Sequence, residues 1–337
     1  MKNKLKFIFI FIFVLSSCGI KINLSVAESF DFHTNIQYEY LSSDDVYTLP
    51  DNVKGIRELS IPSPLTLCWD NIPDSNYEVY VSEDNQFTNP TLYTTKNNYY
   101  ELYNFKINTT YFIKISNGKS NSDINEVTIN SSKIRNIYLD GVTNVRDLGG
   151  KVTLNNKTIK QSMLYRGAAL EGITSFGKNE FINNLKIKTE IDLRYEGEIG
   201  KTSLPCVPNI NYYECPLHFN KLIDSKEIIR NVFSYLENID NYPIYYHCTI
   251  GTDRTGYISF LVNAILGLSI EDIYLDYLFS NFAKIGGSRN KDSINHYVNL
   301  INDCEGSDLL EKTENFLDKY YQISEKTINN IRNLLLE

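Results

Sequence analysis

One segment constrains the fold of this chain more than any other: a short apolar strand that leads through a polar loop into an apolar helix. Residues 243–246 are the apolar run, residues 247–256 are the loop, and residues 257–266 are apolar at most positions. This order predicts a strand–loop–helix unit whose loop N–H groups converge on one point at the positive end of the helix. An anion bound there would be a phosphate or sulfate dianion.

The loop carries a nucleophile and a cation at set positions. Arg254 can bind two oxygens of a bound dianion, and the same field lowers the pKa of Cys248, which makes the thiolate a nucleophile near neutral pH. Alone, a buried cysteine is usually inert core and a charged residue is usually solvated surface. The fixed offsets favour catalysis instead, and they involve His247, Cys248, Gly251, Arg254, Thr255 and Gly256.

The segment around this loop, from residue 136 to residue 337, alternates strand and helix patterns. Residues 189–193 and 211–213 are typical of strands, and residues 228–239 repeat apolar side chains at helical spacing behind the capping residues Asp224 and Ser225. Residues 324–336 have the pattern of a terminal helix. This alternation predicts an α/β domain with a central sheet flanked by helices.

Residues 55–132 follow a different pattern, with short alternating runs separated by turn residues. They predict a small all-β sandwich that precedes the α/β domain. The arrangement of Trp69, the strand at Tyr77 and the segment before Tyr111 resembles a fibronectin type III module, and the resemblance makes Tyr111 its corner tyrosine. Trp69 is expected in the core rather than at a ligand.

The α/β segment resembles the cysteine-dependent protein tyrosine phosphatase superfamily, in particular a bacterial branch with an aspartate beside the loop arginine. The loop is the main likeness, and it covers His247 to Gly256 with Asp253 before Arg254. Further segments similar to that branch are Asn144–Gly150, Leu164–Ala168, Ile191–Arg194 and Asp276–Asn281.

The resemblance implies a phosphatase that acts on phosphotyrosine, with phosphoserine or phosphothreonine as further substrates. The reaction would pass through a phosphocysteine on Cys248 without a metal or other cofactor. Asp253 is the first candidate for the general acid, Asp192 the second and Asp147 the third; residues 213–217 lack an aspartate, and Glu214 remains open. Two loop residues have expected roles: His247 orients the loop, and Thr255 can form a hydrogen bond to the sulfur. The other residues expected at the substrate site are Thr249, Ile250, Gly251, Thr252, Gly256 and Arg146.

Two alternatives stay open at this point. Relatives that hydrolyse phosphoinositides commonly carry lysine where this chain has Thr252, which lowers the odds of a phosphoinositide or inositol phosphate substrate. Arg146, Arg166 and Arg194 could supply the missing charge, or they could form structural ion pairs. A non-catalytic surface binding protein is the rival from another class, and the intact Cys248 and Arg254 argue against it.

The first residues have the composition of a leader. Three lysines precede an apolar run of nine residues, Phe7–Leu15, which is too short for a bilayer span of about 20 residues and fits a secretory signal. Residues 15–18 resemble a lipobox, so we expect a lipid anchor at Cys18; cleavage after Ala27 is the alternative. Either route places the protein outside the cytoplasm as a secreted or membrane-anchored protein. Residues 28–54 are polar and predict a tether, although Tyr38 and Tyr40 alternate as in an extra strand.

Charge and cysteine content exclude several functions. The formal net charge of −8 becomes −11 without the three lysines among the first 17 residues, so binding of nucleic acid through the overall field is not expected. The six cysteines form no paired zinc pattern and are too sparse for a disulfide scaffold. Cys206 and Cys215 could pair or protect Cys248, and unpaired structural cysteines are the preferred interpretation.

Overall fold

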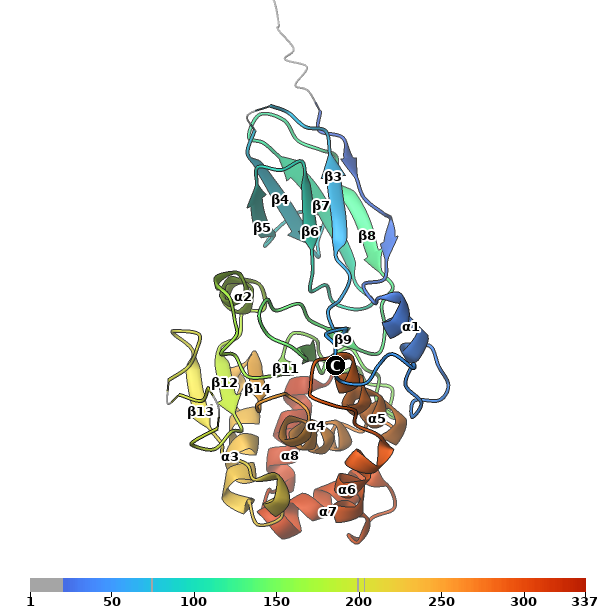
Figure 1. Cartoon of the computed structure of the whole chain (residues 1–337), viewed down its shortest axis with the longest axis vertical. Helices are drawn as coiled ribbons and strands as arrows, with labels where there is room; N and C mark the ends of the chain where they lie inside the picture. Colours follow the sequence, from blue (N-terminus) through green and yellow to red (C-terminus); the bar gives the residue numbers. More distant parts are fainter. Residues whose placement is uncertain (1–20, 74, 199, 203) are drawn as a thin grey trace, which may run out of the picture.

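A computed structural model of the chain describes residues 21–337 apart from residues 74, 199 and 203. The predicted lipobox cysteine, Cys18, and the apolar run before it lie outside these residues. Within the described part of the chain, no helix has the length and apolar character that a membrane span needs. Figure 1 shows a β part at one end of the long axis and a mixed α/β part at the other.

The β part contains two sheets whose inner faces share one hydrophobic cluster. One sheet has the order β1-β3-β6 and the other β2-β8-β7-β4-β5. In β7, Tyr111, Ile113 and Ile115 are buried and the residues between them are not, as the period of two predicts. The strands are β1 (Leu24–Ser25), β2 (Ser29–Phe30), β3 (Leu65–Trp69), β4 (Tyr77–Ser82), β5 (Thr91–Thr95), β6 (Tyr99–Leu102), β7 (Thr110–Ser116) and β8 (Asn125–Ile129).

Two aromatic residues named from the sequence lie in this cluster. Trp69 is buried and packs edge-on against Tyr77, with 5.2 Å between ring centroids. The Tyr111 hydroxyl accepts a hydrogen bond from the N–H of Lys106 at 2.9 Å, a contact of the kind expected for a corner tyrosine. The fibronectin type III resemblance as a whole stays a prediction.

The tether prediction for residues 28–54 is wrong. This segment first adds β2 to the second sheet, then forms helix α1 (Asn35–Leu41) and packs onto the α/β part. Tyr38 and Tyr40 are both helical, not extended; Tyr38 is exposed and Tyr40 lies in the core of the α/β part. The few apolar residues that anchor the segment are spread among polar ones, which hid their burial from a periodicity argument.

The α/β part is built on a six-stranded sheet in the order β13-β12-β14-β11-β10-β9. The central strands β11, β14, β12 and β13 run parallel, and β9 and β10 are antiparallel additions at one edge. All four residues of β14 are buried, which fits its place between β11 and β12. The strands are β9 (Arg135–Asn136), β10 (Arg146–Asp147), β11 (Leu164–Gly167), β12 (Thr189–Asp192), β13 (Asn211–Glu214) and β14 (Ile244–His247).

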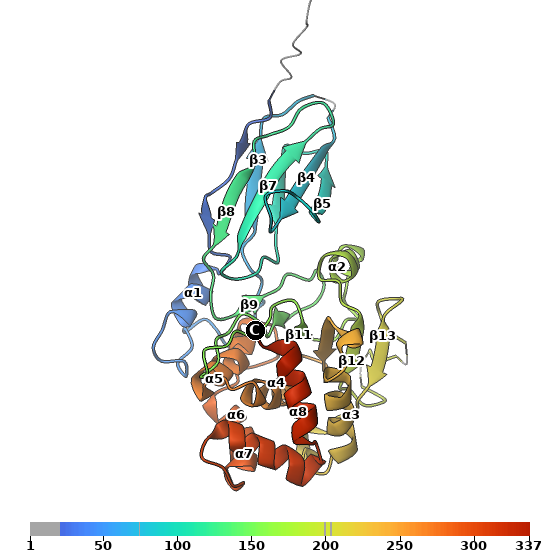
Figure 2. The same ribbon diagram turned by 180° about the vertical axis from the view of Figure 1, so that it is seen from behind.

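Helices cover this sheet, as Figures 1 and 2 show from opposite sides. Helix α4 follows β14 directly and is buried at every position from Thr255 to Ile265, as the apolar sequence there predicts. The helices are α2 (Ser175–Asn179), α3 (Lys226–Leu236), α4 (Asp253–Ile265), α5 (Ile270–Leu278), α6 (Lys291–Asn302), α7 (Leu309–Phe316) and α8 (Glu325–Leu335). Shorter turns are η1 (Glu180–Asn184), η2 (Phe219–Lys221), η3 (Ile239–Asn241), η4 (Phe279–Phe282) and η5 (Leu317–Tyr321).

One buried arginine joins the two parts. Arg135 donates from Nε to the carbonyl of Phe105 at 2.9 Å and from Nη2 to the carbonyl of Asn104 at 2.8 Å, both in the β part. Its Nη1 pairs with the Asp147 carboxylate at 2.6 Å in the α/β part. Because loss of these bonds would leave a buried cation and a buried carboxylate without their opposite charge, the arginine ties the parts together.

Candidate active site

The strand–loop–helix unit places Cys248 at the carboxyl end of the central strand β14, directly before a tight loop that enters α4. The Cys248 side chain is buried. Gly251 has a φ of +69°, and a Cβ there would lie 2.3 Å from the carbonyl carbon and oxygen of Gly167 at the end of β11. Only glycine therefore allows the loop to turn this closely over the sheet.

Several groups favour the thiolate form of Cys248. Burial alone would raise the pKa of this thiol, but the Arg254 guanidinium, the Thr255 hydroxyl and the N–H groups of Thr255 and Gly251 outweigh it, so the pKa lies below its ordinary value. The Thr255 hydroxyl is buried and has no hydrogen-bond partner among the described residues, so it is available to the sulfur. The lowered pKa raises the share of thiolate, which is the nucleophilic form of the side chain.

Arg254 is held by a carboxylate that the sequence did not point to. Glu198 accepts from Nη1 at 2.5 Å and from Nη2 at 2.7 Å, and the Leu193 carbonyl also accepts from Nη1. Thr249 donates its hydroxyl to the same carboxylate. Burial opposes the charge, yet the bonds from Arg254 and Thr249 lower the pKa of Glu198 to about 2, so the carboxylate stays charged and orients the guanidinium.

His247 lies on the strand side of the loop, where an orienting residue was expected. Its Nε2 is 2.9 Å from a Glu190 carboxylate oxygen and its Nδ1 is 3.1 Å from the Cys248 carbonyl oxygen. Burial disfavours the imidazolium, but the hydrogen bond to Glu190 and the charge of Asp192 raise the pKa of His247. The ring is fully buried and fixes the backbone at Cys248.

The loop is braced from behind through its carbonyl groups. Asn144 donates from Nδ2 to the carbonyls of Ile250 and Gly251 and to the Thr252 hydroxyl, at 2.9 Å, 3.1 Å and 3.2 Å. Arg166 donates to the Gly251 carbonyl at 2.8 Å. Because these carbonyl groups are directed toward the sheet, the N–H groups of the loop are left to bind an anion on the Cys248 side. The Thr252 side chain is buried against Asn144 and offers no contact to a substrate.

The three further arginines form structural ion pairs. Arg146 was expected to bind substrate; instead it is buried and bonds the Asp276 carboxylate at 3.0 Å. Arg166 pairs with the same carboxylate at 2.8 Å, and Arg194 with Asp192 at 2.8 Å. Each guanidinium is buried and paired with a carboxylate, although Nε of Arg166 and Nη1 of Arg194 have no hydrogen-bond partner among the described residues. The ion pairs hold all three inside the protein, so none of them replaces the missing loop lysine.

The candidate general acids differ in how accessible they are. Asp192 and Asp147 are fully buried, held by Arg194 and Arg135. Glu214 pairs with Lys201 at 3.0 Å. Asp253 alone among the three aspartates is partly exposed: its side chain is 28% exposed at the start of α4, within the loop that carries Cys248.

Two residues absent from the sequence argument hold Asp253. Arg289 donates from Nε to Oδ1 at 2.9 Å and from Nη2 to Oδ2 at 2.8 Å, and the Tyr277 hydroxyl donates to Oδ1 at 3.1 Å. Tyr277 lies in a segment similar to the bacterial branch, but no pattern in the sequence singled out Arg289 or Glu198. Gly256 allows the Tyr277 ring to approach, since a Cβ there would lie 2.8 Å from the ring.

Exposed aromatic side chains border the arginine. The Tyr195 ring lies 5.6 Å from the Arg254 guanidinium carbon and is 41% exposed. His218 stacks on Tyr195 with 4.7 Å between ring centroids and an interplanar angle of 20°. Together they form a flat wall beside the anion-binding loop.

A sequence profile of the tyrosine phosphatase family matches residues 137–337, which hold strands β10 to β14 of the sheet, the Cys248 loop and the ion pairs of Arg254 with Glu198 and of Arg289 with Asp253. The chain belongs to the tyrosine phosphatase family. The chain is 25% identical over 173 residues to a protein of Cupriavidus necator that carries a provisional assignment as a tyrosine-protein phosphatase. The match covers 43% of this chain and 63% of that relative's length.

Two solved structures are similar to this chain at lower identity. The core catalytic domain of the PP-IP phosphatase Siw14 of S. cerevisiae, in complex with citrate, is 16% identical with a TM-score of 0.30 over 40% of this chain and 78% of that one. TpbA of P. aeruginosa, as a cysteine-to-serine variant in complex with phosphotyrosine, is 14% identical with a TM-score of 0.29 over 55% and 93%.

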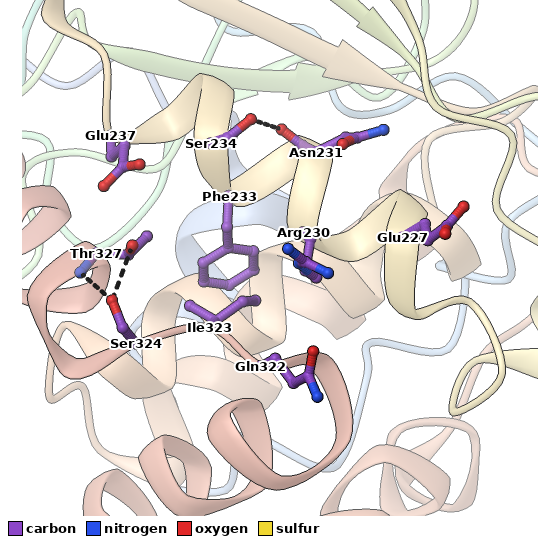
Figure 3. A pocket seen from close by; sticks show the side chains of 10 residues that line it. All are labelled: Glu227, Arg230, Asn231, Phe233, Ser234, Glu237, Gln322, Ile323, Ser324 and Thr327. Carbon is purple, nitrogen blue, oxygen red and sulfur yellow. Dashed lines mark hydrogen bonds between the residues drawn. The ribbon is translucent and has the colours of Figure 1, made fainter.

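A second concave site lies away from this chemistry. A polar groove of about 430 Å³ between α3 and α8 is lined by Arg230, Phe233, Ile323 and their neighbours, and by no residue of the Cys248 loop (Figure 3). Arg230 and Glu227 lie on α3, and Gln322 and Ser324 come from the segment before α8. The groove plays no part in the function argued below.

Proposed function

We propose that this phosphatase hydrolyses phosphotyrosine in proteins through a phosphocysteine on Cys248. The observation that carries the proposal is the placement of Cys248 and Arg254 on one tight loop between β14 and α4, where the guanidinium lowers the pKa of the thiol. A thiolate and a bidentate cation within one loop suit in-line attack on a phosphate monoester and stabilise the charge on its equatorial oxygens.

In the first step, Cys248 Sγ forms a bond to phosphorus as the phosphorus–oxygen bond to the leaving group breaks. The leaving phenolate takes a proton from the general acid. In the second step, water attacks the phosphocysteine, the same residue takes the water proton, and the thiolate leaves with release of inorganic phosphate. The Thr255 hydroxyl beside the sulfur stabilises the departing thiolate.

Asp253 is the residue we propose as general acid and base. It has the accessible carboxylate at the entrance of α4, whereas Asp192 and Asp147 are fully buried. Its bonds to Arg289 and Tyr277 fix its orientation, which proton transfer requires.

The wall of Tyr195 and His218 supports an aromatic leaving group. A phenyl ring bonded to a phosphate in the loop can pack beside the exposed Tyr195 ring, which gains apolar contact and aromatic stacking. An inositol phosphate would instead call for further cations around the loop, and Thr252, Arg146 and Arg166 are all turned inward. The observations therefore support the phosphotyrosine proposal over the inositol alternative.

Hydrolysis of p-nitrophenyl phosphate by the wild type and by Cys248→Ser tests this function. We expect turnover in the wild type, unaffected by a chelator, and none in the variant. Equal activity in both proteins would rule out Cys248 as the nucleophile, and no activity in either would favour the non-catalytic binding protein. Turnover of a phosphotyrosyl peptide against a phosphoinositide then ranks the substrates, and preference for the phosphoinositide would contradict the proposed aromatic site.

We also propose that the mature protein begins at Cys18 as a lipoprotein outside the cytoplasm. Two residues near the start of the described chain support this route: Ile22 is fully buried in the β part and Leu24 pairs with Trp69 across β1 and β3. Cleavage after Ala27 would remove both, and cleavage before Cys18 keeps them. Labelling with a fatty acid that Cys18→Ser abolishes would support the proposal; a secreted chain that begins at Glu28 would overturn it.

A further inference from the structure

We propose that residues 53–59, which we call the brace segment, complete the active site by fixing Arg289 so that it positions Asp253 for proton transfer. This inference rests on Asp253 as the proposed general acid. It assigns a positioning role to Arg289 and a role in catalysis to a segment that lies outside the match to the family profile, residues 137–337.

The contact at the site is a two-bonded ion pair. Arg289 binds both carboxylate oxygens of Asp253, and its remaining guanidinium bond is to the Gly287 carbonyl at 3.2 Å. A planar guanidinium that spans both oxygens fixes the plane of the carboxylate. The direction in which Asp253 presents its oxygens therefore depends on where the backbone of Arg289 lies.

One buried side chain clamps that backbone. Asn281 accepts from the N–H of Arg289 at 2.6 Å and donates to the carbonyl of Arg289 at 3.0 Å. Asn281 is fully buried at the end of η4. The backbone carbonyl oxygen of Asn281 accepts a hydrogen bond from the N–H of Gly55 at 2.9 Å, so Asn281 contacts the brace segment directly.

The brace segment also holds the loop before Arg289. The carbonyl of Gly55 accepts three hydrogen bonds, from the N–H groups of Ile285, Gly286 and Gly287 at 2.9 Å, 2.9 Å and 3.2 Å. Leu59 donates its N–H to the Phe282 carbonyl at 2.6 Å. Because Gly286 and Gly287 carry no side chains and have open surroundings, the carbonyl of Gly55 supplies the order that this loop otherwise lacks.

The residue at the centre of these contacts has to be glycine. Gly55 has a φ of +68°, and a Cβ there would lie 2.5 Å from the Gly287 carbonyl oxygen. That oxygen is also the one that accepts from Arg289. A side chain at position 55 would therefore push directly on the group that supports the guanidinium.

The test uses the leaving group as the readout, because loss of proton donation harms a basic leaving group more than an acidic one. We would measure kcat/KM with phenyl phosphate and with p-nitrophenyl phosphate for the wild type, Gly55→Ala, Arg289→Lys and Asp253→Asn. The expected result is that Gly55→Ala and Arg289→Lys each lose about tenfold more activity toward phenyl phosphate than toward p-nitrophenyl phosphate.

Gly118→Ala is the matched control. Gly118 also has a positive φ, +79°, but nothing lies within 4 Å of its Cβ position and it is in the β part. This variant carries the same kind of backbone strain, and the ratio of the two activities should stay at the wild-type value. If Gly55→Ala does not fold, Arg289→Lys decides the matter, since lysine keeps the charge but cannot span both oxygens.

The outcomes separate the two proposals. If Asp253→Asn leaves the ratio unchanged, Asp253 is not the general acid and the proposed function loses its proton donor. If Asp253→Asn shifts the ratio but Gly55→Ala and Arg289→Lys lower both activities equally, the brace segment is only structural and this inference is overturned. When Gly55→Ala is added to Asp253→Asn, the ratio should not shift further.

Discussion

At the scale of single residues, the site depends on a balance of charge around one sulfur. Arg254 favours the Cys248 thiolate, and Glu198 neutralises part of that cation while it fixes its orientation. The two residues come from segments 56 positions apart in sequence. A nucleophile and its cation could be read from one loop, but the carboxylate opposite them could not, because no local pattern links it to the loop.

This balance predicts opposite shifts of the thiol pKa in two variants. Arg254→Gln removes the cation, so the pKa of Cys248 should rise toward its ordinary value; Glu198→Gln leaves the cation unneutralised, so the pKa should fall further. The pH dependence of alkylation by iodoacetamide measures both. Shifts of the same sign in the two variants would contradict this electrostatic account.

The buried carboxylate of Asp276 should make the stability of the protein depend on pH. Burial would raise its pKa, but Arg146, Arg166 and Lys151 hold the pKa of Asp276 well below the usual carboxyl range. A carboxyl with a lowered folded-state pKa stabilises the protein above its unfolded pKa, and this stability is lost as pH falls toward the folded value. Asp276→Asn should therefore cost about 3–5 kcal/mol at neutral pH, because it leaves two guanidinium groups with too little negative charge.

Urea unfolding of Asp276→Asn and of the wild type, from neutral to acid pH, measures the difference in their free energies of unfolding. The difference between them should be largest near pH 7 and shrink in acid. A difference that does not change with pH would mean that packing, and not the charge of Asp276, carries the effect.

At the scale of elements, the strands of the β part and helix α4 could be predicted because each shows a regular period or a continuous apolar run. Helix α1 could not. Its sequence alternates polar and apolar residues as a strand would, and its burial comes from contacts with a part of the chain more than 200 positions away, such as Tyr40 against Phe282. The same holds for the brace segment, whose bonds run through backbone atoms that leave no trace in side-chain pattern.

The residues of the site also fall into those that the sequence could predict and those that it could not. Cys248, Arg254 and the loop glycines follow from local geometry, and Asp253 was named from its place beside Arg254. Arg146 was misplaced because an arginine near a phosphate loop can either bind the anion or support the loop, and only its partner Asp276 distinguishes the two. The sequence places the candidate nucleophile and its cation in one loop, but it could not show which distant residues hold them.

At the scale of the whole molecule, the two parts share more than a connection. The chain leaves the β part after β2, packs residues 35–59 onto the α/β part and returns for β3. Arg135 then bridges the parts through the carbonyls of Asn104 and Phe105 and the carboxylate of Asp147. Both parts should therefore unfold together.

Arg135→Met tests this coupling. The chain has one tryptophan, Trp69, which lies in the β part, while the helices report on the α/β part through circular dichroism. In the wild type the two signals should change at the same urea concentration; in the variant, which leaves Asp147 unpaired, the midpoints should separate. Coincident midpoints in both proteins would show that other contacts couple the parts.

The central claim is that phosphate passes through the sulfur of Cys248. Rapid quenching of the reaction with p-nitrophenyl phosphate, followed by peptide mass spectrometry, tests it most directly. The account predicts one phosphoryl group on the peptide that contains Cys248, accumulating in Asp253→Asn and absent from Cys248→Ser. Turnover without any phosphoryl group on that cysteine, or a phosphoryl group on another residue, would contradict it.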